Sequence, residues 1–295
     1  MLLFLSLSAC WEEESSAAHT GDSDEPADAG DDSSGDDGDT TPASNPYANC
    51  TATAEYDDLA DGTVDWRQVS QFDANGAVTS QDTDMNVDGA LEYHVAFTND
   101  ADGHALEQRS DMYADGSVEL IDAWTYDADG NVLTWEQDEN GNGTFDNGVN
   151  YVYADGFIQR WDHDDYLDGD IDHVVNFTWT HGDTDVAVQE NDAEMDGTIE
   201  FRSINEYATA GPMLGQEADY GADGFVDVLT EYVYDEDWLL DTLFYTSYGT
   251  AFESTDIWMH TYDEAGRLTL QEYDYQGDGS LDGVYTISYV CAPPT

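Results

Sequence analysis

The sequence predicts an all-β fold, an array of about nine β-hairpin repeats, with about 18 antiparallel strands curled or closed into a barrel-like sheet. Three observations predict it. A phrase D-x-x-x-D-G-x-h-[DE], in which h is apolar, returns about every 27 residues. Apolar and polar residues alternate after each copy, and a second turn motif follows each alternating stretch. A fixed period of this size indicates one supersecondary unit that buries its apolar face by stacking on its neighbours.

The phrase has eight clear copies, and a more divergent ninth lies around Tyr245 to Glu253. Together they occupy residues 49–295, which we therefore expect to form one continuous repeat domain. Positions 1, 5, 6 and 9 of the copies are Asp57/Asp61/Gly62/Asp65, Asp84/Asp88/Gly89/Glu92, Asp111/Asp115/Gly116/Glu119, Asp138/Asn142/Gly143/Asp146, Asp164/Asp168/Gly169/Asp172, Asp192/Asp196/Gly197/Glu200, Asp219/Asp223/Gly224/Asp227 and Asp274/Asp278/Gly279/Asp282.

Each repeat reads as two strands. After the Asp-Gly step the sequence has the period-two alternation of a half-buried strand, as in Leu91, Tyr93, Val95 and Phe97. That strand ends at an aromatic residue and a turn rich in Asp and Gly, and a more polar strand follows. Because Asp can bond its own backbone and Gly supplies positive φ, these turns are typical of hairpins.

The second turn also carries a resemblance to a known family. The segment Tyr262-Asp263-Glu264-Ala265-Gly266-Arg267-Leu268-Thr269 resembles the Y-D-x-x-G-R-L-T signature of the YD repeats of rearrangement-hotspot (Rhs) proteins, and residues 126–133 are a second good match. The resemblance implies long antiparallel sheets that curl into a shell, in an exported protein. This chain is much shorter than those proteins and adds an acidic phrase to every unit.

The sheet must also deal with its edges. A flat sheet of many twisted strands leaves long unpaired edges, which proteins close, cover or charge. We expect a closed or flattened barrel with the aromatic face inside. The alternative is a β-propeller with two hairpins per four-stranded blade, which fits the polar residue at position 3 in every second copy. Cys50 and Cys291 bracket the array, so we predict a disulfide that fastens the first strand to the last.

The N-terminal residues predict export. Residues 1–9 are apolar and precede Cys10, which resembles the bacterial lipoprotein box, in which a signal peptide is removed before a lipidated cysteine. Residues 10–48 are rich in Asp, Glu, Ser and Gly and predict a disordered acidic tether. The acidic run after Cys10 resembles the signals that send some lipoproteins to the outer cell surface. We therefore expect a lipid-anchored protein of the bacterial envelope, at the outer membrane.

Composition limits the partners. The chain has 67 acidic residues against five arginines and no lysine, a formal net charge of −62. With no basic surface to neutralise phosphates, nucleic acid is excluded, and we expect membrane contact through the lipid anchor only.

The acidic phrase offers candidate calcium sites. Calcium prefers six to eight hard oxygen ligands, and a tight loop with Gly at its bend can aim alternate side chains at one point. Four copies also carry an oxygen donor at position 3 and match the front half of an EF-hand-like loop, but the bidentate Glu of a full EF-hand is missing, so the sites should be weak. They are Asp84/Asn86/Asp88/Glu92, Asp138/Asn140/Asn142/Asp146, Asp192/Glu194/Asp196/Glu200 and Asp274/Gln276/Asp278/Asp282. The alternative is that Asp, Asn and Gly are simply good turn residues on a salt-adapted surface.

Two further patterns bear on function. Rows of aromatic residues run along the apolar face, such as Tyr126 and Tyr234 at strand ends; they can stack on sugars if exposed, but more often form core. No nucleophile elbow, zinc signature or phosphate loop occurs, and only His163, with His173 and His181 following, concentrates other metal ligands. We therefore expect a non-enzymatic binding or structural scaffold, or alternatively an adhesive protein that binds a surface glycan or protein.

Overall fold

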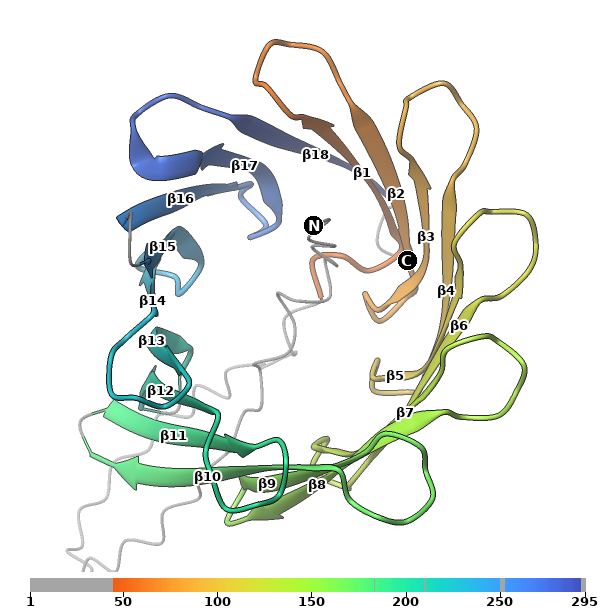
Figure 1. Ribbon diagram of the computed structural model, residues 1–295. Helices are drawn as coiled ribbons and strands as arrows, with labels where there is room; N and C mark the ends of the chain where they lie inside the picture. The colour runs from red at the N-terminus through yellow and green to blue at the C-terminus, as the bar shows by residue number, and fades with distance from the viewer. Residues whose placement is uncertain (1–44, 183, 210, 250–252, 293–295) are drawn as a thin grey trace, which may run out of the picture.

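The computed structural model describes residues 45–182, 184–209, 211–249 and 253–292, which form one closed antiparallel β-barrel (Figure 1). A single turn of 3-10 helix, η2 (Tyr275–Gly277), interrupts the last long loop. The strands are β1 (Cys50–Asp57), β2 (Trp66–Phe72), β3 (Val78–Asp84), β4 (Tyr93–Asn99), β5 (Ala105–Asp111), β6 (Leu120–Tyr126), β7 (Val132–Asp138), β8 (Asn147–Ala154), β9 (Phe157–Asp164), β10 (His173–His181), β11 (Thr184–Asp192), β12 (Phe201–Ala208), β13 (Met213–Tyr220), β14 (Val228–Tyr234), β15 (Leu240–Tyr248), β16 (Glu253–Tyr262), β17 (Leu268–Asp274) and β18 (Gly283–Cys291).

All 18 strands belong to one sheet, in which each strand pairs with its neighbours in the chain. The ring closes where β1 pairs with β18 over its whole length, from Cys50 opposite Cys291 to Asp57 opposite Val284. This continuous ring confirms the barrel prediction and rules out separate propeller blades. Closure removes the exposed edges that an open sheet of this size would present.

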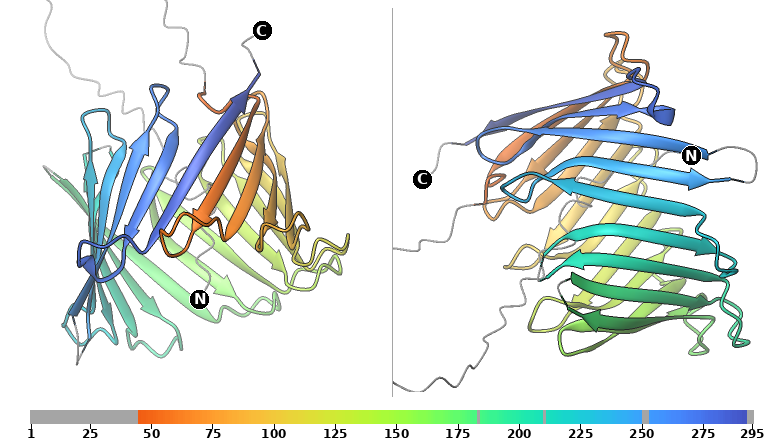
Figure 2. Two further views of the ribbon diagram at one scale, coloured as in Figure 1. Left: turned by 90° about the horizontal axis from the view of Figure 1, so that it is seen from above. Right: turned by 90° about the vertical axis from the view of Figure 1, so that its left-hand side faces the viewer.

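The two ends of the barrel differ, and we name them by their connections (Figure 2). The acidic rim carries the long loops that hold the acidic phrases, such as the loop between β3 and β4. The turn rim carries the short hairpin turns, such as the one between β4 and β5. The β1–β18 junction lies on the turn rim where one further hairpin turn would stand, and a disulfide between Cys50 and Cys291 takes its place.

The two faces of the sheet follow the predicted alternation. The segment just before β1 lies within the ring in Figure 1, and its Tyr47 ring packs 5.4 Å from Phe72 and 5.7 Å from Tyr289. Phe72 and Tyr289 belong to the aromatic row at the strand ends, so the aromatic face is the inner one. The outer face carries residues such as Val290, which is 76% exposed.

Side chains line the inner face of the barrel wall but do not fill the interior. Its most buried side chains are small ones, such as Ala52, Ser70 and Ala187, each 1% exposed. The aromatic side chains beside them are half-buried and pack on one another across strands, as Tyr56 does on Tyr285 with ring centroids 4.2 Å apart. Barrels of 16 to 18 strands are too wide for side chains to fill the interior. The apolar contacts therefore form a shell along the wall.

Aromatic residues at the turn rim tie neighbouring hairpins together. The Tyr126 hydroxyl donates to the Ala105 carbonyl at 2.8 Å, across to the second strand of the preceding hairpin. The same bond recurs between residues 21 or 22 apart in the other hairpins where these bonds are described: Tyr234 to Met213, Tyr262 to Leu240 and Tyr289 to Leu268, with the Trp179 indole N–H donating to Ile158. These aromatics therefore have a structural role that recurs in several repeats.

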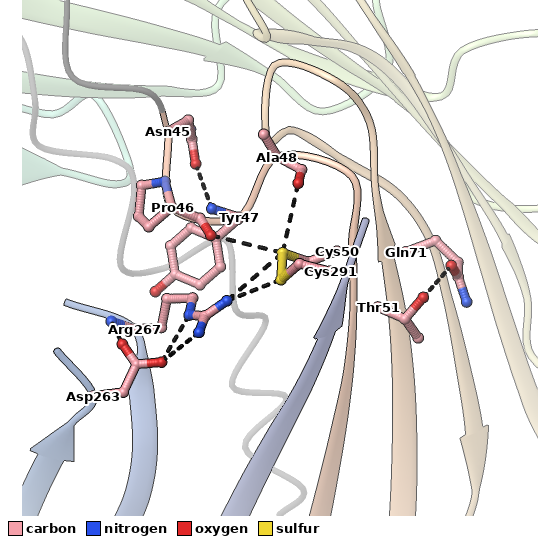
Figure 3. The surroundings of a disulfide bond; sticks show 10 residues. All are labelled: Asn45, Pro46, Tyr47, Ala48, Cys50, Thr51, Gln71, Asp263, Arg267 and Cys291. Atoms are coloured by element: carbon pink, nitrogen blue, oxygen red, sulfur yellow. Dashed lines mark hydrogen bonds and ion pairs between the residues drawn. A yellow bond between two sulfur atoms is a disulfide. The ribbon is translucent and has the colours of Figure 1, made fainter. Parts of the chain in front are cut away.

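The disulfide lies in a polar and aromatic cluster at the turn rim (Figure 3). The Arg267 guanidinium lies 2.9 Å from Cys291 Sγ, bonds the Asp263 carboxylate at 2.7 Å, and lies over the Tyr289 ring at 4.9 Å. The turn at residues 45–48 covers the bridge from the other side, and the Cys50 sulfur lies 3.6 Å from the Pro46 carbonyl oxygen. The predicted disulfide therefore forms, in a well-enclosed setting.

The predicted signal peptide, Cys10 and most of the predicted tether lie outside the described residues. Residues 45–48, which fall within the predicted tether, form a turn against the inner face, because Tyr47 packs on two aromatic rings there. Ordered structure thus begins before residue 49. Within the described ranges, no helix has the length and apolar character needed to cross a membrane.

Candidate functional site

The acidic rim gathers most of the predicted ligands, and each phrase folds into the same tight loop. In the loop after β3, the Asp84 carboxylate accepts hydrogen bonds from the N–H groups of Asp88 at 3.1 Å and Gly89 at 2.9 Å. Val87 and Gly89 adopt positive φ angles of 52° and 91°, which bend the chain around that carboxylate. The position-1 acid therefore replaces backbone partners that the loop cannot supply, which explains its recurrence.

The other two acids of the phrase also hold backbone groups. Asp88 at position 5 accepts the Ala90 N–H at 2.9 Å. Glu92 at position 9 accepts the Met85 N–H at 2.7 Å, so it ties the end of the loop to its start. The same position-9 bond occurs in all eight loops, with acceptors Asp65, Glu92, Glu119, Asp146, Asp172, Glu200, Asp227 and Asp282. Turn formation alone thus accounts for much of the phrase.

Burial and hydrogen bonding act in opposite directions on the position-1 acids. Desolvation raises the pKa of the Asp138 carboxyl, but the N–H groups of Gly143, Asn140 and Asn142 together outweigh it and hold that pKa below its usual value. The pKa values of Asp111 and Asp164 are lowered against desolvation in the same way. These acids are therefore ionised at neutral pH, as metal ligands must be.

Three loops bring their acids together more closely than the rest. In each, one oxygen from positions 1, 5 and 9 lies within 4.8 Å of the other two: Asp84/Asp88/Glu92, Asp111/Asp115/Glu119 and Asp192/Asp196/Glu200. These are the loops with Glu rather than Asp at position 9. The physical reason is length, because the extra methylene of Glu lets the carboxylate reach the other two while it keeps its backbone bond.

This grouping differs from the one that position 3 predicted. Two of the four predicted sets, at 84–92 and 192–200, come together as acid triads. The set at 274–282 does not, since Asp282 is the shorter residue, and the set at 138–146 has Asn142 at position 5 and so holds only two acids of the phrase. The triad at 111–119 was missed because Tyr113 stands at position 3; the Glu at position 9 was the signal in the sequence.

The position-3 side chains have varied roles. The Asn86 amide nitrogen lies 3.4 Å from Glu92, and that of Asn140 lies 3.1 Å from Asp146, so both contact the position-9 acid. Glu194, by contrast, is exposed. Position 3 therefore does not act as one uniform ligand.

The loop at 274–282 differs most from its predicted role as a ligand set. Asp278 is exposed, and its carboxylate accepts the backbone N–H two residues further on, at 2.8 Å. Among the described residues it forms no triad with Asp274 and Asp282. Gln276 has a positive φ of 73°, and its backbone N–H donates to Asp256 at 3.0 Å. In this loop Asp278 supports the turn and the three acids do not converge on one point, and a calcium ligand set here stays a prediction.

The three histidines in which the sequence concentrates other possible metal ligands separate into two places. His163 and His173 are directly opposed on β9 and β10, near the acidic rim. His181 lies at the other end of β10, where it bonds Asp185 at 2.8 Å. Asp165, which the sequence did not single out, lies between His163 and His173.

Surface hollows are small. One, of about 320 Å³, lies on the acidic-rim side of the β1–β18 junction and includes Asp57, Val64 and Val284. Another, of about 260 Å³, includes Glu217, Val226 and Tyr248. Neither gathers the acid triads or the histidine pair.

No family model matches the chain, and no curated protein matches it. Among solved structures, it is similar to a TcdB2-TccC3-TEV crystal structure (16% identity, 75% of this chain, 12% of that chain, TM-score 0.34). It is also similar to the Photorhabdus luminescens Tc holotoxin pore, with 17% identity over 75% of this chain and 12% of that chain and a TM-score of 0.32. A porin-like protein from Bacteroides uniformis is similar at 9% identity over 84% of this chain and 97% of that chain, with a TM-score of 0.41. The chain thus spans about an eighth of the length of the Tc chains. Because all of these TM-scores are below 0.5, no conclusion about fold or function is drawn from these structures. The resemblance to YD repeats stays a prediction.

Proposed function

We propose that this chain is an exported, lipid-anchored scaffold of the bacterial envelope, at the outer membrane, which binds calcium weakly in its acidic loops and presents them to a surface ligand. The observation that carries the proposal is the opposition of the two rims. Both ends of the barrel, Cys50 and Cys291, lie on the turn rim. A tether from Cys10 would therefore hold the turn rim toward the membrane and the acidic rim away from it.

Charge supports a role for cations at the acidic rim. The five arginines each pair with an acid, as Arg67 does with Glu55 at 2.6 Å, and none of these pairs includes a triad residue. Three carboxylates within 4.8 Å of one another repel unless a cation lies between them. Hard oxygen ligands of this kind suit calcium rather than a transition metal.

The first experiment is a thermal melt of the full chain in calcium, in chelator, in magnesium and in sodium chloride of matched ionic strength. Metal that binds only the folded state raises the midpoint. For a dissociation constant of about 1 mM, about 10 mM calcium stabilises each occupied site by about 1.4 kcal/mol. We expect a rise that is specific to calcium; an equal rise in sodium chloride would reduce the loops to charged turns.

A second experiment tests the anchor. We expect the full chain, expressed in a Gram-negative bacterium fed a labelled fatty acid, to carry the label and to sediment with membranes. The substitution Cys10→Ser should remove the label and release the protein from the membrane fraction. Label or membrane association that persists in the variant would contradict lipidation at this residue.

The glycan-binding alternative has less support. Its aromatic rows lie on the inner face, and several of their polar groups already bond backbone carbonyls, as Tyr126 does. These side chains are half-buried and tie one hairpin to the next. A ligand that recognises the calcium-loaded loops of the acidic rim fits the geometry better.

A further inference from the structure

The histidine pair near the acidic rim is a second site of different chemistry. His163 on β9 and His173 on β10 are cross-strand partners, with ring centroids 5.4 Å apart and planes inclined by 26°. The Asp165 carboxylate faces both rings: Oδ1 lies 3.3 Å from His163 Nδ1, and Oδ2 lies 3.1 Å from His173 Nε2. One ligand atom from each of the three residues lies within 4.8 Å of the other two.

The hydrogen bonds of His173 direct its Nε2 atom at the Asp165 carboxylate, which accepts and does not donate hydrogen bonds. His173 Nδ1 lies 2.8 Å from the Ala193 carbonyl oxygen, which only accepts, so Nδ1 carries the proton. In the neutral ring, Nε2 then presents a lone pair to an ionised carboxylate at 3.1 Å. Two acceptor atoms at this distance need a proton or a metal ion between them.

The environment of His163 points the same way. Its Nε2 atom is buried and has no hydrogen-bond partner among the described residues. The neighbouring Trp135 ring lies 6.4 Å away, centroid to centroid. A buried polar atom without a partner is costly, so the orientation of this ring has to be set from its other nitrogen, which faces Asp165.

We propose that His163, His173 and Asp165 bind a divalent transition-metal ion of the zinc class. Tetrahedral zinc, with bonds of about 2.1 Å to nitrogen and oxygen, separates its ligands by about 3.4 Å, close to the 3.1 and 3.3 Å contacts here. The backbone carbonyl of Ala193 holds His173 in the tautomer that metal-bound histidines commonly adopt. Two imidazoles and one carboxylate suit zinc better than calcium, and leave one position open.

The loop between the two strands explains how this site is assembled, and Asp165 is the member that the sequence does not single out. His163 precedes the acidic loop at 164–172 and His173 follows it, so the loop brings together two residues ten positions apart. Asp165 is position 2 of that loop, and Ala193 is position 2 of the next loop along the sheet. The side chains are 29 to 37% exposed, so an ion can enter from solvent.

The test is isothermal titration of the full chain with Zn²⁺, in excess calcium to occupy the acidic triads. We expect one zinc ion per chain, and replacement by Co²⁺ should give the visible spectrum of a tetrahedral site. His173→Ala and Asp165→Asn should each lower zinc affinity at least 10-fold. The matched control is His94→Ala, since His94 also contacts one carboxylate, Asp82, at 2.6 Å, yet belongs to no such triad.

Three outcomes would overturn the proposal. They are the absence of a stoichiometric site in the wild type, unchanged affinity in both site variants while thermal melts show them folded, and an equal loss in His94→Ala. A nitrogen NMR spectrum with His173 doubly protonated in saturating zinc would assign the positive charge to a proton instead. Because calcium is present throughout, failure here is independent of the calcium proposal.

Discussion

The two rims of the barrel use the same residue type for backbone support but differ in what surrounds it. At the turn rim, Asp127 accepts the N–H groups of Asp129 and Asn131 at 2.9 Å, much as Asp84 does in its acidic loop. Three of the turn-rim acids also have neutral or basic side-chain partners: Asn131 for Asp127, His104 for Asp100 and Arg267 for Asp263. In the three loops with Glu at position 9, which we call the Glu loops, the position-1 acids have further carboxylates as neighbours instead.

This difference separates folding from function. An Asp at the start of a turn is explained by the backbone groups it satisfies, and both rims have it. The acidic rim adds a second and a third acid, which also hold backbone groups of the loop and, in the three loops with Glu at position 9, converge on the first. The negative charge of the chain therefore points to cation binding where carboxylates converge, as they do in the three loops with Glu at position 9.

The largest expected effect comes from the turn rim, which alone has the covalent link. Replacing both Cys50 and Cys291 with Ser should lower the free energy of unfolding by about 5 kcal/mol, because the bridge joins residues 241 positions apart and restricts the unfolded chain. Urea denaturation measures the loss, with Cys10→Ser as the control. A loss under about 1 kcal/mol would mean that strand pairing between β1 and β18 suffices for closure.

Lowering the pH should remove the stability that hydrogen-bonded carboxylates provide at both rims. Desolvation opposes the shift, but hydrogen bonds lower the pKa of Asp138 at the acidic rim, and Arg267 with backbone N–H groups lowers that of Asp263 at the turn rim. A pKa lowered by folding gives stability that is present above the unfolded value of about 3.9 and is lost as pH falls through the folded value.

In about 1 M sodium chloride, where charge repulsion is screened, we expect the thermal midpoint to hold from pH 7 to about pH 5 and to fall below about pH 4. Thermal melts followed by circular dichroism measure it. A midpoint that stays level or rises down to about pH 3 would contradict the structural role of these carboxylates.

A smaller effect isolates one acidic loop. Asp84→Ala should lower the free energy of unfolding by about 2–3 kcal/mol, because it leaves the N–H groups of Asp88 and Gly89 without their acceptor at a buried position. Asp88→Ala, an exposed change in the same loop that frees one N–H, should cost less than half as much. Equal losses in urea denaturation would remove the distinction between structural and spare acids within a loop.

Much of the barrel could be predicted from local sequence. The phrase and the turns fix nine hairpins, alternation fixes the two faces, and the placement of Cys50 and Cys291 indicates closure. The turns and the alternation need only the residues of one repeat, whereas closure needs the two cysteines at the ends of the array and the rule that edges must pair.

The candidate sites were harder because they depend on side-chain reach and on contacts between strands. Glu119 and Asp282 make the same backbone bond, and only the structure reveals that the longer side chain draws a triad together. His163 and His173 are paired by the register of one loop, but only the structure shows that both rings face the same carboxylate. Their partner Asp165 looked like one more loop acid.

The measurement that tests the account most directly compares the calcium response of the wild type with that of the triple variant Glu92→Asp, Glu119→Asp and Glu200→Asp. The variant keeps every charge, and it keeps the backbone bond that Asp already makes in the other five loops. We predict that it folds, and that the calcium-specific rise in thermal midpoint seen in the wild type is lost. An unchanged rise in the variant would contradict the assignment of the calcium sites to the three Glu loops.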